Sequence, residues 1–122
     1  MRPTLHDGIF VYATAAPDTD LSGITVIATM RETEGITVIA EELEAQRAEL
    51  PILLRVAWIT LAVESSLQAV GFTAAFASAL AAEAISCNVV AGAHHDHIFV
   101  PIEQASAAMA RLCALQASAK PC

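Results

Sequence analysis

Residues 65–101 read SSLQAVGFTAAFASALAAEAISCNVVAGAHHDHIFVP, and the order of patterns in this stretch decides the expected fold. A polar turn comes first, and the alanine-dense segment 73–84 that follows it favours a helix. Two strand-like runs, 85–91 and 97–100, then flank a polar turn rich in His and Asp. Because the apolar run 54–63 precedes the whole stretch, the predicted order is strand–loop–helix–strand–turn–strand, which is typical of a small α+β module.

Side-chain spacing places the expected core of this module. Phe72, Phe76 and Leu80 recur at intervals that bring them onto one face of the predicted helix. The run 54–63 is almost continuously apolar, which predicts a central strand buried on both faces or at an interface. A last helix is expected over 103–115, where apolar residues again follow helical spacing.

The N-terminal half contains a shorter version of the same order. Segment 8–13 (GIFVYA) predicts a strand, and the β-branched runs 24–30 and 36–40 predict a hairpin in which Gly35 can supply a positive φ. Helix-forming residues follow over 41–50 and stop before a proline.

A weak internal repeat relates the two halves. A shift of about 61 residues aligns ITVIATMRETEGITVIA with ISCNVVAGAHHDHIFVP, hairpin on hairpin, and a helix follows each copy. In the second copy a helix separates the first strand from the hairpin, whereas the loop 15–23 replaces that helix in the first copy. We therefore expect two modules, a degenerate one over 1–52 that lacks its first helix and a fuller one over 53–122.

Composition and charge exclude several classes of partner. The chain has 122 residues, of which 56% are hydrophobic and 16% charged, so a well-buried globular core is expected. Its net charge is −7, and its six Lys and Arg form no cluster, which argues against nucleic acid and anionic membrane surfaces.

Membrane insertion and export are not expected either. The longest apolar stretch, 50–63, falls short of the roughly 18–20 residues that span a bilayer, and it contains Pro51 and Arg55. The N-terminus lacks the apolar core of a signal peptide, so we expect a cytoplasmic protein. Cys87, Cys113 and Cys122 are odd in number and lack CxxC spacing, which predicts free thiols and no disulfide framework.

The stretch 65–101, supported by GIFVYAT and RETEGITVI in the N-terminal half, resembles the ACT family of small regulatory domains, and most closely a compact bacterial subgroup with two ACT domains in tandem. This resemblance implies an α+β fold of two ferredoxin-like modules, each an antiparallel sheet with helices packed on one face. It also implies a homodimer that binds a free amino acid or similar small metabolite near a module or subunit interface. The family's usual Pro-Gly in the strand–helix loop is Val70-Gly71 here.

The loop before the predicted helix is a candidate ligand site. Unpaired N–H groups and a partial positive charge at a helix N-terminus suit a carboxylate, and Gly71 would let the backbone approach one closely. Ser65, Ser66 and Val70 precede that point and are the further candidates. The alternative is that the serines only cap a turn and that Gly71 only permits it.

The His/Asp turn is the second candidate. In an extended strand His95 and His97 would share one face, and Asp96 would point the other way. Asp96 could accept a hydrogen bond from an ammonium group, while His95 supplies a tunable hydrogen bond and Asn88 contacts the ligand from the sheet. The alternatives are a plain polar turn and the beginning of a metal site on the two histidines, for which three or four ligands would be needed.

The sequence contains no GxSxG, GxxxxGK[ST] or GxGxxG motif, so no motif supports nucleophilic catalysis or nucleotide binding. We therefore expect a non-catalytic sensor of a small metabolite with no cofactor. Two alternatives stay open: a small metal-dependent or hydrolytic enzyme that uses His95, Asp96 and His97, and an interaction module that assembles only with a partner.

Overall fold

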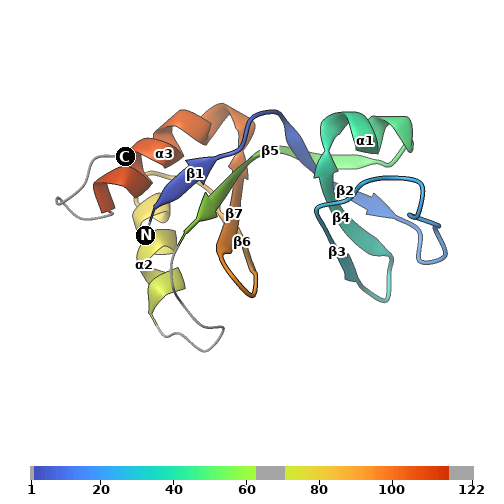
Figure 1. Ribbon diagram of the computed structural model, residues 1–122, viewed down its shortest axis with the longest axis horizontal. Coiled ribbons are helices and arrows are strands. Elements are labelled where there is room, and N and C mark those ends of the chain that lie inside the picture. Colours follow the sequence, from blue (N-terminus) through green and yellow to red (C-terminus); the bar gives the residue numbers. More distant parts are fainter. Residues whose placement is uncertain (1, 63–70, 116–122) are drawn as a thin grey trace. The chain divides into compact units, whose positions relative to one another are not determined.

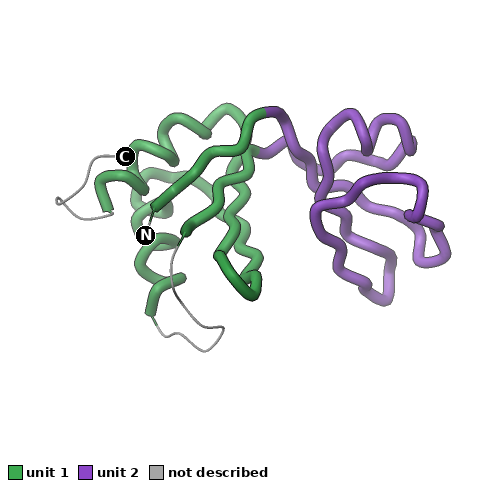
Figure 2. The backbone as a smooth tube through the Cα atoms, viewed as in Figure 1, with its two compact units in different colours: residues 1–7, 57–122 green, residues 8–56 purple. Residues whose placement is uncertain are grey.

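The computed structural model describes residues 2–62 and 71–115 and divides into two compact units. Unit 1 comprises residues 1–7 and 57–122, and unit 2 comprises Gly8–Val56 (Figure 2). The expected boundary between 52 and 53 differs from this division in that the first seven residues belong with the C-terminal unit. They do so because a short N-terminal strand, residues 3–5, pairs with residues 59–61, which lie in unit 1.

Unit 1 is a sheet with helices on one face (Figure 1). Its elements are β1 (Pro3–Leu5), the second half of β5 (Ile52–Leu61), α2 (Phe72–Ala81), β6 (Asn88–Ala91), β7 (Asp96–Pro101), the 3-10 turn η1 (Ile102–Gln104) and α3 (Ala105–Leu115). The strand order is β1-β5-β7-β6, and both β1–β5 and β6–β7 are antiparallel. The core forms where Phe76 and Leu80 of α2 and Leu112 of α3 pack against Ile59 and Ile98 of the sheet.

Unit 2 is built from fewer elements. They are β2 (Phe10–Ala15), β3 (Ala28–Arg31), β4 (Ile36–Glu41), α1 (Glu42–Arg47) and the first half of β5. All pairings are antiparallel and the order is β3-β4-β2-β5. Residues 16–27, all of which are described, contain turns and no helix. The core is accordingly made of small side chains, with Val11, Ala13 and Val38 of the sheet packed against Ala45 of α1.

The two hairpins repeat with an offset of 60 residues, one fewer than the sequence alignment suggests. Ala28 pairs with Ile39 in β3–β4, and Asn88 pairs with Phe99 in β6–β7. The expected positive φ at Gly35 is not found. Gly35 is needed for a different reason, because a Cβ at this position would lie 2.5 Å from the carbonyl oxygen of Ala15.

Two further expectations, on the burial of residues 54–63 and on the cysteines, need correction. β5 is buried from Val56 onward, but residues 52–55 are exposed, because in unit 2 this strand lies at the sheet edge. Cys113 is disulfide-bonded, contrary to the expectation of free thiols throughout. Cys87 is free and half-buried, and burial raises the pKa of its thiol to about 11, so it is a poor nucleophile at neutral pH.

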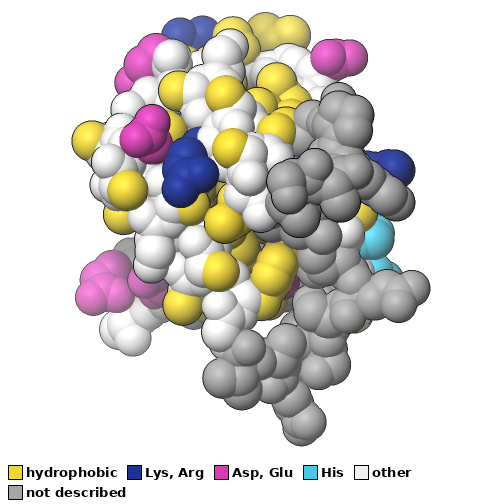
Figure 3. Space-filling view, turned by 90° about the vertical axis from the view of Figure 1, so that its left-hand side faces the viewer, with side chains coloured by type: hydrophobic (Ala, Val, Ile, Leu, Met, Phe, Trp, Pro, Cys, Tyr) yellow, Lys and Arg dark blue, Asp and Glu magenta, His cyan; other side chains and the backbone are white. Residues whose placement is uncertain are grey.

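The surface of unit 1 over α2 and α3 carries scattered apolar side chains with few charges, as the space-filling view from that side shows (Figure 3). Ala74, Ala75 and Ala81 of α2 are among the exposed residues. Within the described parts of the chain, no helix is both long enough and apolar enough to span a membrane.

Candidate functional site

Gly71 stands at the start of α2 in a left-handed conformation, with φ 90° and ψ −18°. Its carbonyl oxygen accepts the N–H of Ala75 at 3.1 Å, which is the first bond of the helix. A residue with a Cβ would be strained at this φ, although no atom lies within 4 Å of where the Cβ would be. The turn therefore requires glycine. The other candidates of this loop, Ser65, Ser66 and Val70, lie outside the described residues.

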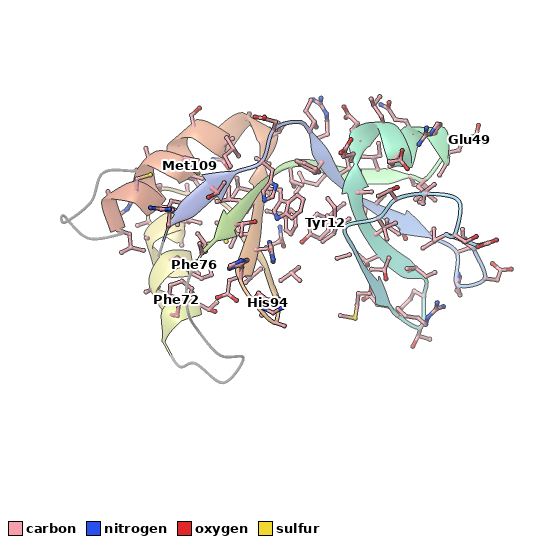
Figure 4. All side chains as sticks on the ribbon, in the orientation of Figure 1. Tyr12, Glu49, Phe72, Phe76, His94 and Met109 are labelled. Atoms are coloured by element: carbon pink, nitrogen blue, oxygen red, sulfur yellow. The ribbon has the colours of Figure 1, made fainter. Side chains whose placement is uncertain are left out.

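The β6–β7 turn places the His/Asp residues in different settings. His94 and His95 are exposed in the turn itself, which is closed by the Gly92 N–H donating to the His95 carbonyl at 2.9 Å (Figure 4). β7 begins at Asp96, so His97 lies in the strand, whereas His95 lies in the turn before it. Asp96 is only 9% exposed.

Strand alternation also separates Asn88 from Asp96. Asp96 lies on the face of β7 that Ile98 presents to the helix-side core, whereas Asn88 pairs with Phe99 on the opposite face. Asn88 is exposed and lies at the other end of the hairpin from Asp96. What the fold does bring to one end of unit 1 is the start of α2 and the β6–β7 turn (Figure 1). No group of three His, Cys, Asp or Glu in the described residues could hold a metal ion.

Unit 2 has a cavity at the end of its sheet where β2 finishes. A cavity of about 480 Å³ opens there between the end of β2, the loop after it, the β3–β4 turn and the segment between α1 and β5. Its walls are formed by Thr14, Ala15, Ala16, Thr19, Glu34, Ala48, Glu49, Leu50 and Pro51. This site could not be predicted from the sequence, because its residues come from segments far apart in the chain and follow no common pattern.

Local hydrogen bonds fix the walls of this cavity. The N–H of Thr14 donates to the carbonyl of Pro51 at 3.1 Å, which ties the end of β2 to the start of β5. The N–H of Thr19 donates to the carbonyl of Ala16 at 3.0 Å and turns the loop. Gly35 brings the β3–β4 turn against β2, and this contact sets the position of the neighbouring Glu34.

Glu49 is held at the cavity by an unusual helix end. The N–H of Glu49 donates to the Gln46 carbonyl and the N–H of Leu50 donates to the Ala45 carbonyl, both at 3.0 Å. This pair of bonds is a Schellman motif, in which the residue at the position of Glu49 is left-handed and is usually glycine. Glu49 has φ 57°, a conformation that costs a residue with a Cβ about 1 kcal/mol. Figure 4 labels Glu49 at this end of α1.

The cavity lining combines apolar residues with acidic and hydroxyl-bearing ones. Glu34 and Glu49 contribute carboxylates, Thr14 and Thr19 contribute hydroxyls, and none of the nine lining residues is basic. Arg31 reaches the adjoining loop, where its Nη1 donates to the Pro17 carbonyl at 3.4 Å. The lining residues offer hydrogen-bond and charge partners for a ligand, and none of them is a Ser, Cys or His.

Comparison with known proteins identifies relatives of the whole chain. Two sequence profiles described as ACT domain match residues 1–56 and 54–114. A crystal structure of a protein of unknown function from Vibrio cholerae, described as a possible transport protein, is 43% identical, with a TM-score of 0.84 over 95% of this chain and 90% of that one. No protein with a curated functional description matches the sequence.

More distant structures share the fold alone. A protein from Agrobacterium tumefaciens is 12% identical, with a TM-score of 0.78 over 93% of this chain and 87% of that one. The regulatory subunit of aspartate kinase from Thermus flavus is 14% identical, with a TM-score of 0.71 over 96% of this chain and 98% of that one. The expected α+β, ferredoxin-like arrangement of two modules is thereby confirmed.

Proposed function

Since this chain belongs to the ACT domain family, whose members are regulatory small-ligand-binding domains, we propose that it is a non-catalytic sensor of a free amino acid or similar small metabolite. The observation that carries this proposal is the cavity of about 480 Å³ at the open end of unit 2. Its volume suits a small ligand, and its rim combines carboxylates with hydroxyls. We propose that the protein acts in the cytoplasm.

The charges around the cavity suggest how an amino acid would lie. Glu34 and Glu49, which lie on two different segments of the lining, would accept hydrogen bonds from the ligand's ammonium group. Its carboxylate would lie toward the Thr19 hydroxyl and the loop that Arg31 contacts.

Unit 1 offers a second position for the same kind of ligand. The start of α2 at Gly71 would face the ligand's carboxylate, and Asp96 would accept from its ammonium group. Of the other candidates, His95 is exposed in the neighbouring turn, whereas Asn88 lies on the far face of the sheet and would serve a different contact.

A thermal-shift screen of the full chain against the common amino acids tests the ligand class. An amino acid present at 100 times its dissociation constant should add about 2.7 kcal/mol of apparent stability. Glu34→Gln and Glu49→Gln should each weaken binding of that amino acid by about 3- to 5-fold, because they remove one partly solvated charge from the rim. Glu83→Gln, at an exposed site beyond α2 in unit 1, is the matched control and should bind as wild type does.

Two outcomes would contradict this assignment. If no amino acid raises the melting temperature, the ligand class is wrong. If Asp96→Asn abolishes binding while Glu34→Gln and Glu49→Gln leave it unchanged, the ligand occupies unit 1 and the unit 2 cavity is not the site.

We also propose that two copies of the chain associate through the exposed part of β5. In unit 2 this strand is at the sheet edge, and Ile52, Leu53 and Leu54 leave apolar side chains in solvent. Leu53→Glu should convert a dimer to a monomer in sedimentation experiments, whereas Leu43→Glu should not. Leu43 is the matched control, because it is 72% exposed on α1 and Leu53 is 63% exposed on β5. A wild-type chain that sediments as a monomer at micromolar concentration would refute association.

A further inference from the structure

A cluster of aromatic side chains lies on the face of the unit 1 sheet that is turned away from its helices. Ile98 and Val100 of β7 belong to the helix-side core, so the alternate residues His97 and Phe99 point to the other face. The Trp58 ring of β5 lies on that face too, with its centroid 5.8 Å from the His97 ring and 6.1 Å from the Phe99 ring.

His6, the residue after β1, joins this cluster. The His6 ring stacks on Trp58 with 3.6 Å between centroids and 5° between planes. His6 Nε2 lies 2.7 Å from Thr60 Oγ1, and the same hydroxyl lies 3.0 Å from His97 Nδ1. The indole Nε1 of Trp58 donates to His97 Nδ1 at 3.1 Å. The hydroxyl of Thr60 therefore joins two histidines that are far apart in the sequence.

The indole decides which protonation state of His97 this network accepts. An indole N–H can only donate, so His97 Nδ1 must be an unprotonated acceptor and the ring must be neutral. The Thr60 hydroxyl can then share the single lone pair of His97 Nδ1 with the indole N–H and accept from His6 Nε2. A doubly protonated His97 would turn an Nδ1–H toward the Trp58 N–H, and two donors would face each other.

β1 is held by its ladder with β5, by contacts with α3 and by the ring of His6. Its ladder with β5 has three residue pairs, and the His6 N–H extends it by donating to the Trp58 carbonyl at 2.9 Å. Pro3 is buried, but Thr4 and Leu5 are exposed. The stacked and hydrogen-bonded ring of His6 is thus the anchor that joins this strand to Trp58 and Thr60 of β5.

We propose that β1 is a proton-controlled edge of unit 1: protonation of His97 removes the acceptor of the Trp58 indole and loosens β1 from β5. Because Thr60 connects the two rings, the same event disturbs the hydrogen bond that holds His6. The result is that acidification frees the β5 edge over the residues that β1 covers at neutral pH, Ile59 to Leu61.

Burial and neighbouring charges act on both histidines. Burial lowers the pKa of His97, and the nearby His95 and His6 lower it further, while Asp96 raises it. Burial also lowers the pKa of His6, and Asp7 opposes this effect. The His97 ring therefore takes up a proton near pH 6.5 in the unfolded chain but only at a lower pH in the folded chain. The contribution of His97 to the free energy of unfolding is thus complete above pH 6.5 and is lost as the pH falls from 6.5 toward the folded-state pKa.

Hydrogen exchange of the full chain between pH 8 and pH 5 tests this proposal. The protection factor of the His6 amide should fall by about tenfold or more as His97 becomes protonated, while amides of β4 in unit 2 keep theirs. Fluorescence follows the same event, because Trp58 is the single tryptophan of the chain. His97→Gln keeps an acceptor for the indole but cannot gain a proton, so it should remove the pH dependence of β1. His94→Gln, in the exposed turn, should not.

Two results of the hydrogen-exchange experiment would overturn the proposal. Unchanged protection of the His6 amide in the wild type down to pH 5 would overturn the proposal, as would the same loss of protection in His97→Gln. If His97→Gln does not fold, an NMR titration of the wild-type His97 ring replaces it. The midpoint of that titration must coincide with the midpoint of the loss of β1 protection, and a clear mismatch between the two would overturn the proposal.

Discussion

Unit 1 covers its sheet with α2 and α3, whereas unit 2 covers its sheet with the six residues of α1 and a loop. The difference extends to the core, where unit 1 buries Phe76 and Leu80 from α2 and unit 2 has no counterpart of that helix in residues 16–27. Unit 2 has its cavity at the end of the sheet beside this loop. The comparison indicates that a module without this helix has an open cavity at that end and a core of smaller side chains.

Truncating the largest buried side chain of α2 should produce the largest effect. Phe76 is fully buried, so Phe76→Ala should lower the free energy of unfolding of unit 1 by about 4 kcal/mol through the cavity it leaves. Val38→Ala, at a fully buried site of unit 2, should cost only about 2 kcal/mol. Urea denaturation of both variants measures the difference. Equal losses would show that the two cores contribute alike.

The packed turn of unit 2 should give the next effect. Gly35→Ala places a methyl group 2.5 Å from the Ala15 carbonyl oxygen, so the β3–β4 turn must move from β2. We expect a loss of about 2 kcal/mol in thermal or urea unfolding, together with weaker ligand binding, because this contact sets one wall of the cavity. Gly23→Ala is the control, since a Cβ there meets nothing within 4 Å. A Gly35→Ala variant as stable as Gly23→Ala would mean that the turn adapts freely.

The smallest effect should come from two helix ends that share one defect. Glu49 and Ala84 both adopt φ 57° where glycine is favoured. Relief of this strain should raise the melting temperature of Ala84→Gly and Glu49→Gly slightly, by the equivalent of about 0.5 kcal/mol. Only Glu49→Gly should also weaken ligand binding, because Ala84 lies outside the cavity lining. Equal binding by both variants would remove Glu49 from the site.

Local patterns predicted most of the elements. β-branched runs gave both hairpins, and the spacing of Phe72, Phe76 and Leu80 gave α2 with its buried face. β1 was missed, because three residues that include a proline carry no strand signal by themselves. Its pairing with residues 59–61 depends on contacts across more than fifty positions.

The sites were harder to predict for the same physical reason. The cavity of unit 2 is assembled from short segments that are far apart in the sequence, and Glu34 alone is indistinguishable from a solvated turn residue. The contacts of Trp58 with His6 and His97 likewise join three strands that are separated in the sequence. Gly71, in contrast, was expected to permit the turn before an alanine-rich helix, and the structure gives it the left-handed conformation, while its role in ligand binding stays a prediction.

The interleaving of the two units has a consequence for the order of folding. Unit 2 is continuous in the chain, whereas unit 1 needs both its first seven residues and everything after Val56. As the chain leaves the ribosome, Gly8–Val56 can fold as soon as it has emerged, but β1 must wait for the end of β5. Throughout that interval the N-terminal strand remains unpaired, and the long-range closure of unit 1 comes after unit 2 can fold.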